Sequence, residues 1–515
     1  MNTAVNAQDS ERPSGAPLRS VVIVGGGSAG WMTAAALTKS FGKQLEVTLV
    51  ESEEIGIIGV GESTVPHLRD FNSLLQIDEA DFIRRTKGTF KLGIQFNDWL
   101  RVGDSYIHGF GSIGRNLGML DFHQYWLKAR KLGFAKDISH YSVNTLAAPQ
   151  GKFLVPPADV PPNSPLADIV YAYQFDAALY ARYLRAYAEG RGATRIEGKV
   201  VEVRQNGASG FVESVRLESG ATVAGDLFID CSGFRALLIG GTLHSAFQDW
   251  THWLPLDRAI AVPCEKVSPL TPYTRVTARA CGWQWRIPLQ HRTGNGHVYS
   301  SRFISDDEAL EVLLKNLDGK PLADASKPIR FAAGKRDKLW DKNVVAIGLA
   351  GGFLEPLEST AIFLIQAGIF RLVHLFPRSG FDPVLERTYN AQAQFEFERI
   401  RDFLILHYCA TERDDSELWR YCRNMAIPDS LRDYMQLFAD AGRFYRNGTE
   451  LFAVPSWVEV MLGQGIMPRT YHPAVDWVSD ADLRSFVEGI EKVVASCVSI
   501  MPKHEDFIAR HCAAD

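Results

Sequence analysis

The stretch of the chain that most restricts its fold is SVVIVGGGSAGWMTAAALTKSFGKQLEVTLVES, residues 20–52. An apolar run of strand length, Val21 to Val24, leads into a glycine-rich turn. An Ala- and Leu-rich segment of helical character follows, and a second strand-like run, Val47 to Val50, ends at Glu51. This succession predicts a βαβ unit, which places two parallel strands in one sheet.

The turn of this unit fits the pattern G-x-G-x-x-G, in which glycines permit a tight bend, close approach of the backbone to a pyrophosphate, and packing of helix on strand. The residues concerned are Gly25, Gly27, Ser28, Ala29 and Gly30. Glu51 follows at about the ~20-residue spacing of a carboxylate that binds a ribose hydroxyl. The pattern predicts a dinucleotide site, and a glycine turn without a ligand is the alternative reading.

A single glycine fingerprint favours FAD held by the protein over a shuttling nicotinamide, because no second fingerprint follows. Two later segments fit this interpretation. GDLFIDCSGFRA predicts a strand from Leu227 to Asp230, and NVVAIGLAGGFLEPLESTAIFLIQ predicts a strand, a glycine loop and a helix. The second segment would bring Gly348, Gly351 and Gly352 against a flat ligand, whereas ordinary turns of an α/β sheet are the alternative.

Length, charge and cysteine content narrow the class of protein. A chain of 515 residues exceeds what one core usually organises, so we expect two units or one large unit with a lid. A net charge of -5 provides no basic field for nucleic acid or acidic lipid. The seven cysteines lack C-x-x-C spacing, so neither a zinc site nor a disulfide framework is indicated. Because residues 1–19 lack a signal-peptide core and no later run is expected to span a membrane, we predict a disordered tail and a cytoplasmic protein.

Several motifs together resemble the flavin-dependent halogenases, the group that contains the tryptophan halogenases, from about residue 20 to about residue 460. These motifs are GGGSAGW, IGVGEST with Gly61, FKLGIQF, WQWRIP and LEPLEST. The resemblance implies an α/β fold: a Rossmann-like FAD module related to aromatic hydroxylases, residues 20–376, with a mainly helical unit over the substrate, residues 377–515. It implies that reduced FAD and oxygen convert halide into hypohalous acid, which travels to a separate substrate chamber.

Trp283 and Trp285 of WQWRIP are implied to separate the flavin from the substrate, on a short extended segment fixed by Pro288. Two aromatic residues of a half-buried strand are the alternative reading. In TFKLGIQF the apolar residues share one face of a strand and leave Lys91 on the other. That face could be solvent, but the matching position of the family is the catalytic lysine, which hydrogen-bonds the hypohalous acid or becomes a haloamine.

Pro356 prevents backward extension of a helix, so we expect the next helix to start near Glu358. Its free N–H groups at Thr360 and Ala361 would suit a halide, and Glu358 could be a plain capping residue. The resemblance implies instead that Glu358 polarises the oxidant or accepts the ring proton. The family commonly has glycine at the position of Ala361, so the choice between chloride and bromide stays open.

The substrate is expected to be a small aromatic molecule. His108 and Phe110 match the family's H-x-F pair that stacks on the substrate ring, with a pair in the core as the alternative. The family's grip on free tryptophan is matched only in part, by Phe444, Tyr445 and Glu450, with Trp457 as a candidate ring clamp. Indole or an indole derivative without the amino-acid group therefore fits better. An aromatic monooxygenase and a non-catalytic flavoprotein are the alternative functions. A separate flavin reductase is the implied partner, and the oligomeric state is open, with a homodimer as one option.

Overall fold

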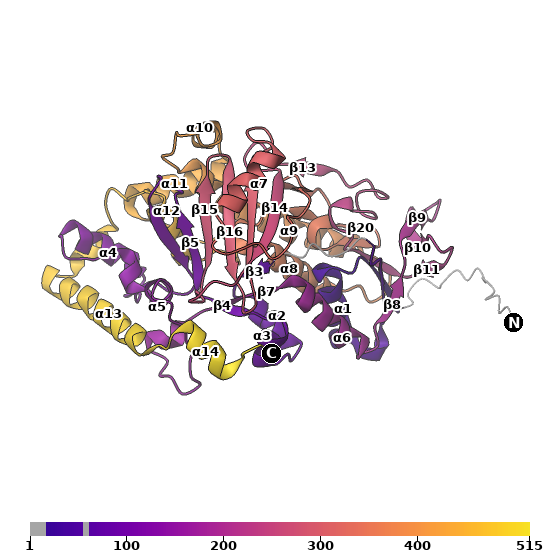
Figure 1. Cartoon of the computed structure of the whole chain (residues 1–515), viewed down its shortest axis with the longest axis horizontal. Helices are drawn as coiled ribbons and strands as arrows, with labels where there is room; N and C mark the ends of the chain where they lie inside the picture. The colour runs from indigo at the N-terminus through magenta and orange to yellow at the C-terminus, as the bar shows by residue number, and fades with distance from the viewer. Residues whose placement is uncertain (1–16, 55–60, 515) are drawn as a thin grey trace.

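The computed structural model describes residues 17–54 and 61–514. Most of the predicted tail, residues 1–16, lies outside the described residues, as do residues 58–60 of the motif IGVGEST. The long axis of the molecule runs from the strands β9 to β11 at one end to the helices α4 and α13 at the other (Figure 1). Their bounds are β9 (Val200–Gln205), β10 (Val212–Leu217), β11 (Thr222–Ala224), α4 (Phe122–Lys131) and α13 (Asp480–Ile500).

A six-stranded sheet contains the predicted βαβ unit, in the order β20-β21-β12-β1-β2-β8. All of its neighbouring pairs are parallel except β20 with β21 at the edge. The predicted strands are present, and α1 (Ser28–Phe41) connects β1 to β2. The strand bounds are β1 (Ser20–Val24), β2 (Glu46–Glu51), β8 (Thr194–Glu197), β12 (Leu227–Asp230), β20 (Trp340–Asp341) and β21 (Val344–Ala346).

A seven-stranded sheet occupies the middle of Figure 1, in the order β18-β14-β17-β16-β15-β5-β6. Its strands are β5 (Gly93–Asn97), β6 (Ser105–Gly109), β14 (Arg258–Cys264), β15 (Thr274–Arg279), β16 (Gly282–Pro288), β17 (Thr293–Tyr299) and β18 (Ile329–Arg330). Three small sheets complete the strands. One is formed by β9 to β11, the second by β3 (Gly61–Ser63), β7 (Ala172–Asp176) and β4 (Thr89–Lys91), and the third by β13 (Phe247–Asp249), β19 (Gly334–Arg336) and β22 (Gly352–Phe353).

The segment from Phe90 to Phe96 is not the single strand that its alternation predicts. The structure breaks it at Leu92, so that Lys91 belongs to the small β3-β7-β4 sheet while β5 belongs to the large one. The break is stabilised by the backbone of Leu92, whose N–H donates to the carbonyl of Pro272 and whose carbonyl accepts from the N–H of Phe110. Lys91 therefore lies where two sheets meet.

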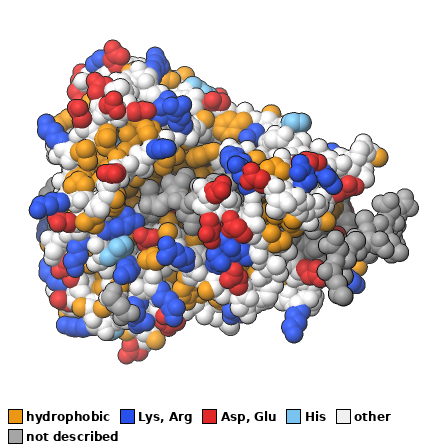
Figure 2. Space-filling model, turned by 45° about the vertical axis from the view of Figure 1, so that its right-hand side comes forward, with side chains coloured by type: hydrophobic (Ala, Val, Ile, Leu, Met, Phe, Trp, Pro, Cys, Tyr) orange, Lys and Arg blue, Asp and Glu red, His pale blue; other side chains and the backbone are white. Residues whose placement is uncertain are grey.

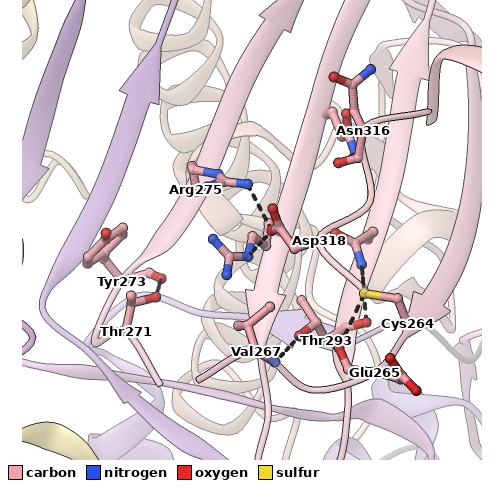
Figure 3. A network of polar contacts seen from close by, with 12 residues as sticks. Cys264, Glu265, Val267, Thr271, Tyr273, Arg275, Thr293, Asn316 and Asp318 are labelled. Atoms are coloured by element: carbon pink, nitrogen blue, oxygen red, sulfur yellow. Dashed lines mark hydrogen bonds and ion pairs between the residues drawn. The ribbon is translucent and has the colours of Figure 1, made fainter. Parts of the chain in front are cut away.

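The sequence WQWRIP forms β16, and its alternation assigns different residues to the two faces of the large sheet. Trp283 and Trp285 lie on the buried face. Arg286 lies on the other face, directly opposite Arg275 of β15. Asp318 forms ion pairs with both, at 3.0 Å to Arg275 and 2.6 Å to Arg286, and so offsets the repulsion of two like charges across the strands (Figure 3).

Helices cover the remaining faces of the sheets. The predicted helical segment AQFEFERIRDFLILHY is part of α9 (Pro383–Cys409), whose Asp382 caps the first turn. The other helices are α2 (Leu68–Leu74), α3 (Glu79–Arg85), α5 (Val143–Ala147), α6 (Ala177–Glu189), α7 (Asp306–Lys315), α8 (Ala361–His374), α10 (Glu417–Asn424), α11 (Asp429–Ala441), α12 (Val454–Gly463) and α14 (His504–His511). One hydrophobic core cluster extends from Val21 to Cys512.

One segment, Leu357–His374, is long and apolar enough to cross a membrane, with a mean hydropathy of 1.2. By length and composition, this segment contradicts the expectation that no run is long and apolar enough to span a membrane. The segment consists largely of α8, and 61% of it is buried inside the fold, where it packs on α1, α2 and α9. This burial is typical of a core helix. On the face shown in Figure 2, acidic and basic side chains are intermixed.

Candidate active site

A cleft of about 810 Å³ opens at the carboxyl ends of β1, β2 and β12. Parallel α/β sheets bind ligands at this edge. Seven of the predicted cofactor-binding residues line it: Gly25, Gly27, Ser28, Ala29, Glu51, Gly348 and Gly352. The lining does not include Gly30, Gly61 or Gly351. Gly61 instead packs on Ile287 and Gly294 of the large sheet, and its neighbour Glu62 faces the cleft.

The glycine turn has the geometry that a pyrophosphate requires. Gly25 has φ +117° and lies so close to Cys231 that an added Cβ would be 2.2 Å from the Cys231 carbonyl oxygen. A Cβ on Gly30 would lie 1.9 Å from the carbonyl of Gly25, so this glycine permits the packing of α1 on β1. A Cβ on Gly27 would meet no protein atom within 4 Å. Gly27 therefore presents bare backbone to the cleft, and the residues present fit FAD.

Glu51 ends β2 beside this turn, as the spacing predicts. Its carboxylate forms an ion pair with Arg195 and lies 3.8 Å from the guanidinium of Arg185. Sequence patterns did not indicate these two arginines. The cleft also holds Glu62, whose pKa burial raises to about 7. The two carboxylates of the cleft therefore lie in different surroundings: Glu51 lies beside two arginines, whereas Glu62 is desolvated by burial.

The amino end of α8 reaches the cleft, and Ala361 is one of the lining residues. Thr360 precedes the helix without a side-chain capping bond, so the first N–H groups of α8 lack an internal acceptor. The helix begins at Ala361, shortly after the start that we expected near Glu358 and Ser359. Glu358 and Ser359 have φ values of 63° and 62°, so the backbone reverses in a short turn, η6 (Leu357–Ser359), before the helix begins.

Lys91 is completely buried, so the solvent-facing alternative for this lysine was wrong. Its Nζ donates to the carbonyl of Thr64 at 2.9 Å and to Oγ of Ser359 at 3.0 Å. The ring centroid of Phe110 lies 5.2 Å from the same nitrogen, in cation–π range. Burial lowers the pKa of Lys91 to about 7, although Glu358 acts in the opposite direction. A lysine with this pKa can exchange a proton near neutral pH.

Glu358 lies between two histidines that come from distant elements. Its carboxylate oxygens are 2.9 and 3.0 Å from Nδ1 of His108 on β6, and Oε1 is 3.0 Å from Nε2 of His407 on α9. Burial by itself raises the pKa of Glu358, but attraction and hydrogen bonds from the two histidines outweigh it and lower this pKa to about 2. We name the set Thr64, Lys91, His108, Glu358, Ser359 and His407 the lysine–glutamate cluster.

Three members of this cluster could not be found from sequence patterns. Thr64 and Ser359 lie in the motifs IGVGEST and LEPLEST, but the contacts of the Thr64 carbonyl and the Ser359 hydroxyl with Lys91 could not be inferred from them. His407 lies four residues after Phe403 on α9, and its Nδ1 is 2.9 Å from the Phe403 carbonyl oxygen. That helical spacing is visible in the sequence, but nothing in it connects α9 to Glu358.

Trp283 and Trp285 are buried with ring centroids 6.1 Å apart. Trp283 also contacts Trp99, at 6.4 Å between centroids. Trp285 lies over Gly296 of β17, where a Cβ would be only 2.0 Å from the indole ring. The glycine therefore makes room for the second indole.

The predicted substrate-binding residues form two groups joined by Phe403. His108 lies 6.3 Å from Phe110 and 5.6 Å from Phe403, between ring centroids. On the far side of Phe403, at 4.9 Å, Trp457 stacks on Phe444.

The ring of Phe452 stacks on Phe403 at 3.8 Å. Glu450 is buried, accepting from the Tyr434 hydroxyl and the Asn447 N–H, while its second oxygen has no partner among the described residues. Phe403 and Phe452, which the sequence did not indicate, lie between the two groups.

Comparisons with known proteins agree over almost the whole chain. The profile of the tryptophan halogenase family matches residues 20–480. A tryptophan 6-halogenase of Streptomyces toxytricini is 34% identical, with 95% of this chain and 97% of the relative aligned. A flavin-dependent halogenase from Xanthomonas campestris has a TM-score of 0.94 at 49% identity, covering 97% of this chain and 99% of that one.

A flavin-dependent halogenase from Brevundimonas sp. BAL3 gives a TM-score of 0.91 at 44% identity, covering 96% of this chain and 99% of that one. These matches confirm the predicted family, the α/β fold and the enzymatic class. The cleft with its glycine turn, the buried lysine and the chain-wide similarity therefore lead to one conclusion: the protein belongs to the tryptophan halogenase family of flavin-dependent enzymes.

Proposed function

We propose that this enzyme uses reduced FAD, oxygen and bromide or chloride to halogenate an electron-rich aromatic molecule, indole or an indole derivative. The observation that carries the proposal is the burial of the Lys91 ammonium in contact with Ser359 and under the field of Glu358. An isolated buried charge is costly, so a lysine held in this way is a strong candidate for a functional group.

The cofactor fits the cleft at the carboxyl ends of the parallel strands. Gly25, Gly27, Ser28 and Ala29 would hold the pyrophosphate, and Glu51 the ribose. When bound, FAD supplies the oxidising chemistry that turns halide into hypohalous acid. The free N–H groups at the start of α8, at Thr360 and Ala361, would bind the halide.

The lysine–glutamate cluster would carry out the second half of the reaction. Lys91 holds the halogen close to the ring carbon, either as an ammonium that hydrogen-bonds the oxidant or as the amine that takes up the halogen. Glu358 accepts the proton that the ring loses, which its carboxylate form permits. Trp283 and Trp285 would exclude water and keep the cofactor apart from the aromatic substrate.

The substrate would lie beside His108 and Phe110. Free tryptophan needs a carboxylate partner and an ammonium partner, and the first of these positions carries Phe444 rather than a tyrosine. Indole needs neither group. Relatives named as tryptophan halogenases make tryptophan the second compound to be tested.

A separate flavin reductase would supply reduced FAD, because the chain has one glycine fingerprint and no second one for a nicotinamide. We further propose that the protein works in the cytoplasm, where such reductases and their nicotinamide donors are present. Rapid oxidation of NADH by the purified enzyme alone would argue against the need for a separate flavin reductase.

Mass spectrometry of reaction products tests the function directly. The enzyme is incubated with FAD, a flavin reductase, NADH, and either bromide or chloride, with indole or tryptophan as substrate. A product with the isotope pattern of bromine or chlorine supports the proposal. A product that carries oxygen at a rate independent of halide would indicate an aromatic monooxygenase, and flavin binding without any product would indicate a non-catalytic flavoprotein.

A further inference from the structure

His407 faces a hydrogen-bond acceptor on each side of its ring. Its Nδ1 lies 2.9 Å from the carbonyl oxygen of Phe403, and its Nε2 lies 3.0 Å from Oε1 of Glu358. A carbonyl oxygen can only accept, so Nδ1 carries a hydrogen. The side chain is completely buried, and water does not compete for either position.

The contact between Nε2 of His407 and Oε1 of Glu358 requires one more proton. A neutral imidazole that is protonated on Nδ1 offers only a lone pair at Nε2, and a carboxylate oxygen also offers only lone pairs. Two buried acceptors at 3.0 Å would repel each other and leave both groups unsatisfied. A proton therefore lies between them, either on His407 as an imidazolium or on Glu358 as a carboxylic acid.

The surroundings of Glu358 favour the imidazolium. The carboxylate also receives Nδ1 of His108, at 2.9 Å, on its other side. The titratable groups packed around the pair are Lys91 on β4, Tyr106 and His108 on β6, Glu355 before η6, and Glu459 on α12.

We propose that His407 is a positioning residue that carries two protons and, by donating from Nε2, holds Glu358 ionised and directed at His108. The consequence for catalysis rests on the proposed function, in which Glu358 accepts the proton that the ring loses on halogenation. The cation at position 407 also balances the charge of Glu358, so that the carboxylate raises the pKa of Lys91 less than it would alone.

His504 provides an internal reference with the opposite arrangement. Its Nδ1 lies 3.0 Å from the carbonyl of Leu270, as in His407, but its Nε2 accepts a hydrogen bond from the N–H of Phe90 at 3.1 Å. Nε2 of His504 therefore has no hydrogen, and the ring is neutral. Burial accordingly lowers the pKa of His504 to about 4.

Nitrogen NMR of the full-length, FAD-loaded protein with labelled histidine distinguishes the two rings. We expect both nitrogens of His407 to be protonated, and only Nδ1 of His504. The His407→Gln variant assigns the signal. An unprotonated Nε2 of His407 would place the proton on Glu358 and overturn the proposal. This experiment needs no substrate, so its outcome does not depend on whether the enzyme halogenates indole.

The His407→Gln variant also tests the consequence for catalysis. Glutamine keeps an N–H donor for Glu358 but carries no charge, so the pKa of Glu358 should rise. Because Glu358 must be ionised to accept a proton, the ratio of variant to wild-type product per oxygen consumed should fall at least about twofold from pH 8 to pH 5. A ratio that is lowered equally at both pH values would show that His407 only fills space, and would refute its role.

The matched control is His297→Gln. His297 is also buried, with Nδ1 3.0 Å from the carbonyl of Ala309, but it lies on the outer face of the large sheet. For His297→Gln, the ratio of variant to wild-type product per oxygen consumed should stay constant across this pH range. Flavin oxidation by both variants should stay within about twofold of the wild type, since neither side chain lines the cleft.

Discussion

The flavin cleft and the lysine–glutamate cluster are built by opposite means. The cleft is open and is formed around glycine turns, strand ends and the start of α8. The cluster is closed and made of side chains contributed by separate elements, with Lys91 and Ser359 268 residues apart in the chain. Binding a large cofactor therefore depends on local backbone geometry, whereas holding a small reactive species depends on the packing of the whole fold. Changes in the two regions should have separable effects.

The largest effect is expected for Lys91→Met, which keeps an unbranched side chain and removes the ammonium. Formation of halogenated product should fall by at least about 100-fold. Oxidation of reduced flavin should stay near the wild-type rate, because Lys91 does not line the cleft. Product by mass spectrometry and oxygen uptake, measured in the same reaction, give the two rates.

A second buried lysine serves as the control for Lys91→Met. Lys335 on β19 is also completely buried and donates to the carbonyl of Arg336, outside the cluster. Lys335→Met should preserve halogenation. A folded Lys91→Met enzyme that still gives full product would remove the lysine from the mechanism, and one that no longer oxidises flavin would refute the separation of the two regions.

Two glycine variants should affect the cleft differently. In Gly27→Val the side chain points into open space, so FAD affinity should fall by at least about tenfold while the melting temperature of the FAD-free protein stays unchanged. In Gly25→Val the side chain meets Cys231 and the backbone needs φ +117°, so stability should also fall, by about 1–3 kcal/mol. Flavin titration measures the FAD affinity of each variant, and thermal melts measure its stability. Undiminished FAD binding by Gly27→Val would contradict the assigned phosphate site.

The pH dependence of the two half-reactions should differ as well. Burial lowers the pKa of Lys91 to about 7, so product formed per oxygen consumed should change through this pH, separately from any change in oxygen consumption that Glu62 of the cleft causes. If the ammonium is the active form, the ratio falls as pH rises; if the amine is active, the ratio rises. A ratio that is flat from pH 6 to pH 8 would exclude a titrating lysine from delivery of the halogen.

The smallest effect is expected for Glu450→Gln with indole as substrate. Glu450 is held by Tyr434 and Asn447, and indole has no ammonium group for it to bind. The KM for indole should therefore change by less than about threefold, because the substitution removes no contact with the substrate. A larger loss, measured by steady-state kinetics, would assign Glu450 a direct contact with the substrate.

The elements of the cleft could be predicted because their signals are local. Val21 to Val24, Val47 to Val50 and Leu227 to Asp230 all lie within strands, and the spacing of Gly25 to Glu51 identifies the turn and its carboxylate. Each of these patterns is set by backbone geometry within about 30 residues. Family resemblance then supplied Lys91 and Glu358 as candidates.

The cluster could not be predicted in the same way because its cause is tertiary. The strand breaks at Leu92 through hydrogen bonds with Pro272 and Phe110, and alternation of apolar residues carries no information about such partners. The positive φ of Glu358 could not be predicted from the sequence either, because residues other than glycine rarely adopt this conformation. His407 reaches Glu358 only because α9 packs there. A histidine in an apolar helix otherwise gives no sign of its partner.

The turn before α8 has a consequence for protein engineering. Glu355, Glu358 and Ser359 all adopt positive φ, at 78°, 63° and 62°. Such a conformation costs an L-residue about 1–2 kcal/mol, which glycine would not incur. Directed evolution for heat resistance should therefore favour glycine in this turn, and each such replacement removes a polar group from the interior. Without a screen for activity, selection for thermostability should accumulate glycine substitutions in this turn, and the selected variants should be inactive.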